Sequence, residues 1–358
     1  MVPLTEFGDS CSCGKNKYGM SMTNSSRRDV LAPAGPAWAG SLMGTSIFAT
    51  LAHIHDVPVI PELLLVMAVG ILGFMVVGWL RLRNPPFHSK LMAPWGMLSM
   101  GIMALGSAAT ALASNSSWQL TSWWIGAPLA IYVSLRQQRG FEGEPTFQWG
   151  LALVAPMVAA TSSAQLSVDY GTFYHVCGKI FFWMALITVL PVFVRCYVAL
   201  FSGTMRIPDS IAGTAWIPLG LVGQSTAAAQ LLFNRTFAVA YGTAVLIVGV
   251  FLAVIALRRF TRAVIRWAGY SPGWWGATFP VGTLSLGTHS LGDTTGVQWL
   301  YVVSAGLLCL LAVHWCACVA RFVWWVREQA SQARPAPARC GSGLLVAQYP
   351  ARRRGTEP

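Results

Sequence analysis

Five prolines recur along the chain at a nearly constant interval, each at the start of an apolar stretch or inside one. The intervals are 58, 62, 62 and 62 residues, and the prolines are Pro36, Pro94, Pro156, Pro218 and Pro280. A membrane-spanning helix needs about 20 mostly apolar residues, so each interval has room for two spans and their loops. Internal repeats of this length in apolar sequence are typical of membrane transport pathways. The spacing therefore predicts one helical hairpin used five times.

The composition places the chain among integral membrane proteins. Hydrophobic residues make up 55% and charged residues 10%, whereas a soluble domain carries about a quarter charged residues. We expect one transmembrane domain over 32–325, between cytoplasmic, disordered tails at 1–31 and 326–358. Ten predicted spans lie at 36–54, 62–80, 92–113, 118–135, 147–166, 173–194, 214–233, 237–257, 274–292 and 297–325.

The net charge of +12 reflects topology rather than a nucleic-acid partner. With ten spans and a cytoplasmic N-terminus, 22 of the 24 Lys and Arg residues fall on the cytoplasmic side; only Lys179 and Arg235 fall outside. Positive charge concentrated in this way is the signature of membrane insertion. The sequence thus predicts a multi-pass protein of the cell membrane with both termini in the cytoplasm.

Small residues divide the spans into two sets. Windows of 18 residues starting at the repeat prolines contain Gly, Ala, Ser or Thr at 46 of 90 positions, and matching windows in the even-numbered spans at 25 of 90. Small residues let helices approach closely or leave room for a conduit. Tight packing alone explains some enrichment but not its alternation. The predicted fold is all-α, with an inner ring of five odd-numbered helices around a central pore.

Two columns of small residues follow the repeat prolines, and we predict that they line the pore. Five residues after each proline come Ser41, Ser99, Thr161, Gly223 and Ser285. Seven residues after come Met43, Gly101, Ser163, Ser225 and Gly287. The alternative is that each hydroxyl bonds back to its own helix, which is common in membranes. Because proline removes a backbone hydrogen bond, we also expect helix kinks at Pro94, Pro156 and Pro218.

An aromatic residue breaks the sameness of the repeats. Phe279 precedes Pro280, whereas the other repeat prolines follow Gly, Ala or Ile. A residue before proline is biased out of the helical conformation, so its ring could project across the conduit as a gate. The alternative is a phenylalanine packed between helices. Almost no charge lies within the odd spans, which favours a path for small anions over a proton or cation pathway.

Histidines and cysteines leave weaker alternatives open. His289 is the titratable group deep in the ninth span, and a packed neutral histidine is favoured over gating by pH. His314, Cys316 and Cys318 offer three ligands without a fourth, so no metal site and no cofactor are predicted. A haem or quinone subunit would need paired histidines on facing helices. His53, His55 and His175 make one such pair conceivable.

Several motifs resemble the tellurite-resistance/dicarboxylate transporter family, which includes yeast malate permeases, sulfite exporters and plant slow anion channels. The similarity covers about 32–325, and its motifs are Pro33-Ala34-Gly35, Met43-Gly44-Thr45, Phe87-His88, Ser99-Met100, Trp216-Ile217-Pro218-Leu219-Gly220, Gly223-Gln224-Ser225 and Trp274-Trp275 with Thr278-Phe279-Pro280-Val281-Gly282-Thr283.

This resemblance implies five helical hairpins around a pore that the aromatic ring of Phe279 occludes, commonly in trimers. It also implies no enzymatic activity. With the motifs, Gly44, Thr45 and Gln224 join the predicted pore lining. Substrates in such a family are C4-dicarboxylates such as malate and succinate, sulfite, chloride and nitrate. The favoured interpretation is passive passage of these anions through the gated pore, and the alternative is a proton-coupled carrier of dicarboxylate or sulfite.

Overall fold

The computed structural model describes residues 35–332, so the predicted tail 1–31 lies outside the described residues, as does most of the tail 326–358. Within that range there are ten α-helices, one at each predicted span. They are α1 (Ala39–Ile54), α2 (Ile60–Leu82), α3 (Met92–Ala113), α4 (Ser117–Gln137), α5 (Trp149–Tyr170), α6 (Thr172–Phe201), α7 (Ile217–Leu232), α8 (Arg235–Ile265), α9 (Phe279–Thr295) and α10 (Gln298–Gln332).

Six helical segments are long and apolar enough to cross a membrane, namely those of α2, α3, α5, α6, α8 and α10. Three of the other helices are short, with 16 residues in α1, 16 in α7 and 17 in α9. Each short helix follows a 3-10 helix that lengthens it. These leading segments are η2 (Pro36–Trp38), η4 (Asp209–Trp216) and η5 (Pro272–Ala277).

Contacts between helices follow a repeating scheme. Each odd helix packs against the even helix that follows it, as in the pairs α1–α2, α3–α4, α5–α6 and α7–α8. The odd helices also contact one another in order, α1 with α3, α3 with α5, α5 with α7 and α7 with α9, and α9 returns to α1. Helix α10 joins α9 through Ser304 and α1 through Trp315. The five odd helices therefore form a closed circuit of contacts.

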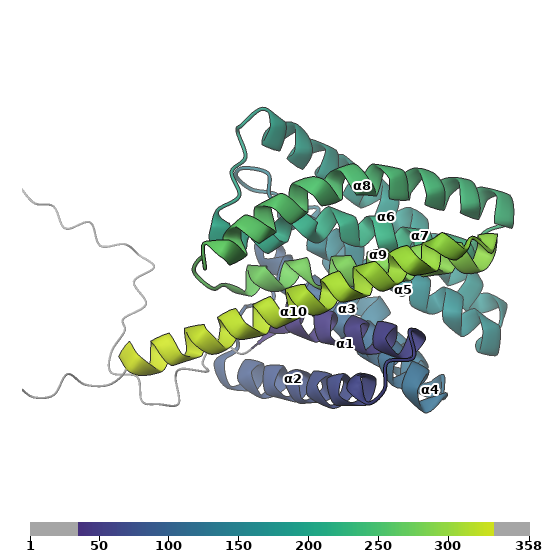
Figure 1. Cartoon of the computed structure of the whole chain (residues 1–358), viewed down its shortest axis with the longest axis horizontal. Helices are drawn as coiled ribbons and strands as arrows, with labels where there is room; N and C mark the ends of the chain where they lie inside the picture. Colours follow the sequence, from purple (N-terminus) through teal and green to yellow (C-terminus); the bar gives the residue numbers. More distant parts are fainter. Residues whose placement is uncertain (1–34, 333–358) are drawn as a thin grey trace, which may run out of the picture. The chain divides into compact units, whose positions relative to one another are not determined.

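Apolar side chains are exposed mainly on the even helices. Large examples are Val66 on α2, Ile187 on α6, Phe251 on α8 and Val302 on α10, each at least 70% exposed. Almost every residue of α7 is buried by comparison. Figure 1 shows α2 along the lower edge of the helix bundle, α8 along its upper part and α10 crossing in front of it. An apolar surface of this extent requires a lipid environment, because water would solvate it poorly.

Most of the repeat prolines occupy helix starts in place of the expected kinks. Pro94 is in the first turn of α3, and Pro218 and Pro280 are each the second residue of their helices. The missing N–H of proline has no helical partner in a first turn, so the residue is tolerated there without breaking the helix. Among the five, Pro156 is the one that lies beyond the first turn of its α-helix, as the eighth residue of α5. The other four prolines lie at the start of an odd helix or of the 3-10 segment that leads into it.

Some even helices run well past the predicted spans. Helices α6 and α8 continue to Phe201 and Ile265, and α10 continues to Gln332, inside the segment predicted as a tail. The sequence there contains Arg327, Glu328 and Ala330, which are good helix formers. Hydropathy marks where a helix leaves the apolar layer, not where its hydrogen bonding ends.

Candidate functional site

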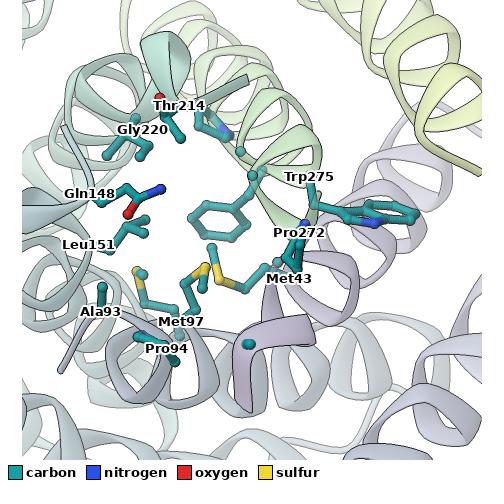
Figure 2. Close-up of a pocket in the computed structure, with 18 of the residues that line it drawn as sticks. Met43, Ala93, Pro94, Met97, Gln148, Leu151, Thr214, Gly220, Pro272 and Trp275 are labelled. Atoms are coloured by element: carbon teal, nitrogen blue, oxygen red, sulfur yellow. The ribbon is translucent and has the colours of Figure 1, made fainter. Parts of the chain in front are cut away.

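A cavity of about 270 Å³ lies among the N-terminal ends of the five odd helices. Every odd helix or its leading segment supplies lining residues. They are Gly40 and Met43 of α1, Pro94, Met97 and Met100 of α3, Leu151 and Val154 of α5, Ile217 and Gly220 of α7, and Phe279 and Pro280 of α9. Figure 2 shows Met43, Met97, Leu151 and Gly220 arranged around this common space.

The lining of this cavity is apolar, with polar groups only at a few points. Gln148, Thr214 and Ser271 contribute polar side chains, and none of the described residues that border the cavity is Asp, Glu, Lys or Arg. The cavity also lies at the end of the helices where unpaired backbone N–H groups give a partial positive charge. Such a space has no fixed charge of its own, and its backbone dipoles favour an anion over a cation.

The predicted gate residues border this cavity. Phe279 is the first residue of α9 and is 3% exposed. It follows η5 and Thr278, whose Oγ1 donates a hydrogen bond to the carbonyl oxygen of Trp275 at 2.8 Å. Opposite Pro280 stands Gly220 of α7, where a Cβ atom would meet Pro280 Cγ at 3.5 Å. The junction of η5 and α9 thus holds the phenyl ring at the wall of the cavity.

Glycines bring α7, α9 and α1 into close approach. Gly223 packs against the backbone of α9 at Thr283, and Gly287 packs against the backbone of Gly223. Gly44 leaves room for the side chain of Thr278. A Cβ atom at any of these positions would collide with its neighbour, so glycine is required by close packing. Three of the predicted lining residues therefore serve contacts between helices.

The hydroxyls five residues after the repeat prolines point to neighbouring helices or to their own backbone. Ser99 Oγ donates to the carbonyl of Gly126 in α4 at 2.9 Å, and Ser285 Oγ donates to the carbonyl of Ser304 in α10 at 2.8 Å. Ser41 Oγ donates to the carbonyl of Trp38 at 2.7 Å. None of the three is among the described residues that border the cavity. Ser99 and Ser285 therefore join neighbouring helices, and Ser41 bonds to the backbone of the preceding turn.

Most of the residues seven positions after the prolines, together with Thr45, also form hydrogen bonds or packing contacts within or between helices. Ser163 Oγ accepts a hydrogen bond from Trp123 Nε1 in α4 at 2.7 Å. Thr45 Oγ1 accepts one from Trp315 Nε1 in α10 at 3.0 Å. Ser225 Oγ donates to the carbonyl of Val222 in its own helix at 3.3 Å, and Gly101 packs against Leu42 of α1. Met43 is the member of this column that borders the cavity.

Gln224 and Thr161 meet one turn deeper than the cavity. Gln224 follows Gly220 by four residues and so lies on the same face of α7. It is 4% exposed, and its Oε1 atom is buried without a hydrogen-bond partner. Thr161 Oγ1 lies 3.4 Å from the backbone carbonyl of Gln224 and 3.2 Å from that of Met157. Gln224 is therefore a buried polar group with spare hydrogen-bonding capacity.

A cluster of titratable side chains lies at the opposite end of α9 from the cavity. His289 Nδ1 is 3.2 Å from Asp293 Oδ2, and its ring stands edge-on to that of His55 at a centroid distance of 5.6 Å. His55 Nε2 is 3.1 Å from Ser304 Oγ, and Tyr301 donates to Asp293 at 3.0 Å. Burial and the neighbouring His289 lower the pKa of His55. His289 thus belongs to a polar network rather than to the cavity.

His314 and Cys318, weighed above as metal ligands, are occupied by backbone contacts. His314 Nδ1 lies 3.0 Å from the carbonyl oxygen of Ala277, and its ring packs between Trp216 and Phe260. Cys318 Sγ lies 3.4 Å from the carbonyl oxygen of Trp274. Both residues therefore attach α10 to η5, the segment that leads into Phe279.

Several lining residues were not predicted from the sequence. Met97, Met100, Leu151 and Gln148 border the cavity, but methionine and leucine are common in any membrane helix, so their residue type does not indicate a site. What indicates it is their position relative to the repeat prolines. Phe279 and Ile217 immediately precede repeat prolines, and Met97 follows one by three residues. These two positions are four residues apart and lie on the same side of an α-helix, so each residue is on the corresponding side of its own helix.

Comparison with known families decides the class of the protein. The sequence model of the family described as "Voltage-dependent anion channel" matches residues 34–323. The chain belongs to this family. The resemblance inferred from the proline-centred motifs is thereby confirmed, and the chain is a multi-pass membrane protein of anion transport and not an enzyme.

Curated relatives of the family are similar at low identity. The "Sulfite efflux pump SSU1" of Arthroderma benhamiae is 23% identical over 309 residues, covering 72% of this chain and 81% of the relative. The protein of the same description from Trichophyton rubrum has the same identity and coverage. That from Arthroderma otae is 23% identical over 332 residues, covering 75% of this chain and 87% of the relative.

Proposed function

We propose that this chain lets small anions pass through a conduit between α1, α3, α5, α7 and α9, and that Phe279 closes it. The observation that carries this proposal is the cavity to which all five odd helices contribute and whose wall includes Phe279 and Pro280. An internal space shared by helices that otherwise pack tightly is expected along a transport path. Membership of an anion channel family agrees with it.

The charge distribution supports anions that move down their own gradient. None of the described residues that border the cavity is ionisable. The histidine and carboxylate side chains described on the odd helices lie in the C-terminal halves of those helices, away from the cavity; they are His53 of α1, Asp169 of α5, and His289 and Asp293 of α9. A coupled proton carrier normally holds an ionisable group beside its substrate. Backbone dipoles at helix starts, with Gln148 and Thr214, provide attraction for an anion without binding it too tightly to leave.

For the substrate we put sulfite first, because three curated relatives are described as sulfite efflux pumps. Chloride, nitrate and C4-dicarboxylates such as malate and succinate are the other candidates that the resemblance implies. An apolar lining and a volume of about 270 Å³ suit a small anion better than a bulky one. None of the described residues that border the cavity is an arginine that could hold a second carboxylate, which ranks dicarboxylates below anions with a single charged group.

For the arrangement in the membrane, we propose ten spans in five hairpins, with the odd helices inside and both termini in the cytoplasm of the cell membrane. The hairpin contacts, the exposed apolar side chains of the even helices and the one-sided distribution of basic residues support it. The cavity then opens on the cytoplasmic side. A homotrimer with one pore per subunit is proposed by resemblance to the family.

The test is anion flux into proteoliposomes that contain the purified full chain. Sulfite, chloride, nitrate and succinate are compared at a clamped membrane potential, with and without a pH gradient. Passive conduction predicts that each anion follows its own electrochemical gradient and ignores the pH gradient. Protein-free liposomes and liposomes with a cation-selective channel are the controls. Absence of flux for all four anions, in correctly folded protein, would refute the proposal.

A second candidate is a proton-coupled carrier, favoured by the contact between His289, Asp293 and His55. A proton taken up there could be coupled to an anion in the conduit. In that case sulfite or succinate would accumulate only under an inward proton gradient, and His289→Ala would abolish the accumulation. Passive conduction predicts that His289→Ala leaves the flux of each anion unchanged.

A further inference from the structure

A second cavity, of about 390 Å³, lies between the C-terminal part of α8 and η4. Its lining combines three arginines of α8 with apolar side chains and one carboxylate: Arg258, Arg259, Arg262, Ile255, Ile207, Ala212 and Asp209. Arg258 and Arg262 are one helical turn apart, with Arg259 between them. Three arginine residues therefore border one space.

The positive charge of this cavity is not balanced by the residues around it. Asp209 is occupied by Arg266, whose Nη1 lies 3.3 Å from Asp209 Oδ2. Within the part of the chain that the structure describes, no carboxylate forms an ion pair with Arg258, Arg259 or Arg262. Unpaired guanidinium groups held together repel one another, and an oxyanion between them would relieve that repulsion.

The surroundings of the cavity distinguish a lipid from a soluble anion. Along α8 before the arginines, Val250, Phe251 and Val254 are 45–70% exposed. These apolar side chains continue on the same helix to the basic cavity, so one molecule with an apolar chain and an anionic head can contact both. Basic pockets beside apolar helix surfaces at a membrane face bind anionic headgroups in this manner.

We propose that this cavity binds the phosphate headgroup of an anionic phospholipid, with the acyl chains along the exposed face of α8. The guanidinium groups of Arg258, Arg259 and Arg262 donate hydrogen bonds to the phosphate oxygens, and Ile207 and Ile255 contact the glycerol end of the chains. The site is separate from the cavity at Phe279, and binding there does not depend on transport.

Binding at this site also bears on η4. Ala212 of η4 borders the lipid cavity, whereas Ile211 and Thr214 of the same segment border the cavity at Phe279. Ser271 of the segment before η5 donates a hydrogen bond to the carbonyl of Ser210 at 2.7 Å. A bound headgroup therefore holds the short segment that connects the two cavities, and it raises the thermal stability of the whole chain.

The test measures binding of phosphatidylglycerol to the full chain by native mass spectrometry in a non-ionic detergent, with thermal unfolding as a second measurement. The probes are phosphatidylglycerol, phosphatidylcholine, inorganic phosphate and sulfite. We expect phosphatidylglycerol to bind and raise the melting temperature, with little effect from the other three. Each arginine near a membrane surface contributes about a fivefold change in affinity, so Arg259→Gln should weaken binding about fivefold and the triple Gln variant about a hundredfold.

Arg195→Gln is the matched control. Arg195 is an exposed arginine of α6 that precedes the end of its helix by the same six residues that separate Arg259 from the end of α8. It does not border the cavity, so binding should be unchanged. Arg259→Lys keeps the charge and should retain most of the affinity even if the triple variant fails to fold.

Three results would overturn the proposal. An equal loss in Arg195→Gln and Arg259→Gln would mean that basic charge acts diffusely. Equal binding of phosphatidylcholine would mean that the apolar face alone holds the lipid. Equal stabilisation by inorganic phosphate or sulfite, lost in Arg259→Gln, would make the cavity a site for soluble anions. If the wild-type chain binds phosphatidylglycerol but transports none of the anions, the proposed function fails and the proposed lipid site stands.

Discussion

Replacing Phe279 with alanine separates a gate from an ordinary buried residue. The ring is 3% exposed and borders a cavity of about 270 Å³. Burial of a phenylalanine side chain stabilises a protein by about 1.5–3 kcal/mol. If the ring must leave its site before an anion passes, alanine removes that part of the barrier. A tenfold change in rate corresponds to about 1.4 kcal/mol, so we expect anion flux to rise about 10- to 100-fold.

The same substitution should cost little stability. A buried Phe→Ala change normally costs about 3–5 kcal/mol, since it leaves a cavity behind. Phe279 already has open space on one side, so fewer contacts are lost and we expect a cost of about 1–3 kcal/mol. Stopped-flow flux into proteoliposomes with equal amounts of protein, together with thermal unfolding, measures both quantities.

Phe182→Ala is the control for this experiment. Phe182 is fully buried on α6, where its ring packs against Phe233 and Tyr241 at centroid distances of 5.0 and 5.5 Å, and it does not border the cavity. Its loss should cost about 3–5 kcal/mol and leave flux unchanged. The reasoning fails if Phe279→Ala loses as much stability as Phe182→Ala while its flux stays at the wild-type level.

Three further changes test the surroundings of the conduit. Gly220→Asp should reduce anion flux at least about tenfold through repulsion in a poorly solvated space, whereas the isosteric Gly220→Asn should not; equal effects would point to steric blockage. Ser99→Ala should cost about 1 kcal/mol of thermal stability, because its bond to Gly126 is lost, and leave flux unchanged; a large change in flux would place Ser99 on the conduit. His55→Gln should flatten the pH dependence of stability. Because burial lowers the pKa of His55, the unfolded chain binds this proton first, so the contribution of His55 to stability is constant above about pH 6.5 and becomes destabilising as the pH falls below it. Melting temperatures from pH 8 to pH 4.5 that coincide in shape for the two proteins would contradict the last expectation.

Composition and periodicity were enough to locate the helices. Each predicted span overlaps one α-helix of the structure, and the division into small-residue and bulky spans matches the burial of α7 against the exposure of α2 and α8. Composition predicts the helices because a lipid-facing helix must have apolar side chains, and a helix packed among other helices needs small side chains to allow close approach. Helix ends were less predictable. The 3-10 segments η4 and η5 and the extension of α10 to Gln332 depend on local hydrogen bonds that hydropathy does not report.

For the lining of the cavity, the sequence contains more information than the two small-residue columns. Residues advance about 100° around an α-helix, so the residue before a repeat proline and the one three after it lie within about 40° of each other. The residue five positions after the proline is rotated about the helix axis by about 120° or more from each of these two positions. If Phe279 faces the conduit, Ser285 must face away from it, and the structure places Ser285 against Ser304 of α10. The same argument places Met97 on the side of α3 that borders the cavity and turns Ser99 away from it, where Ser99 bonds to Gly126 of α4. A phenyl gate at Phe279 and a pore-lining hydroxyl at Ser285 are therefore incompatible on one helix, and the position of the aromatic ring decides between them.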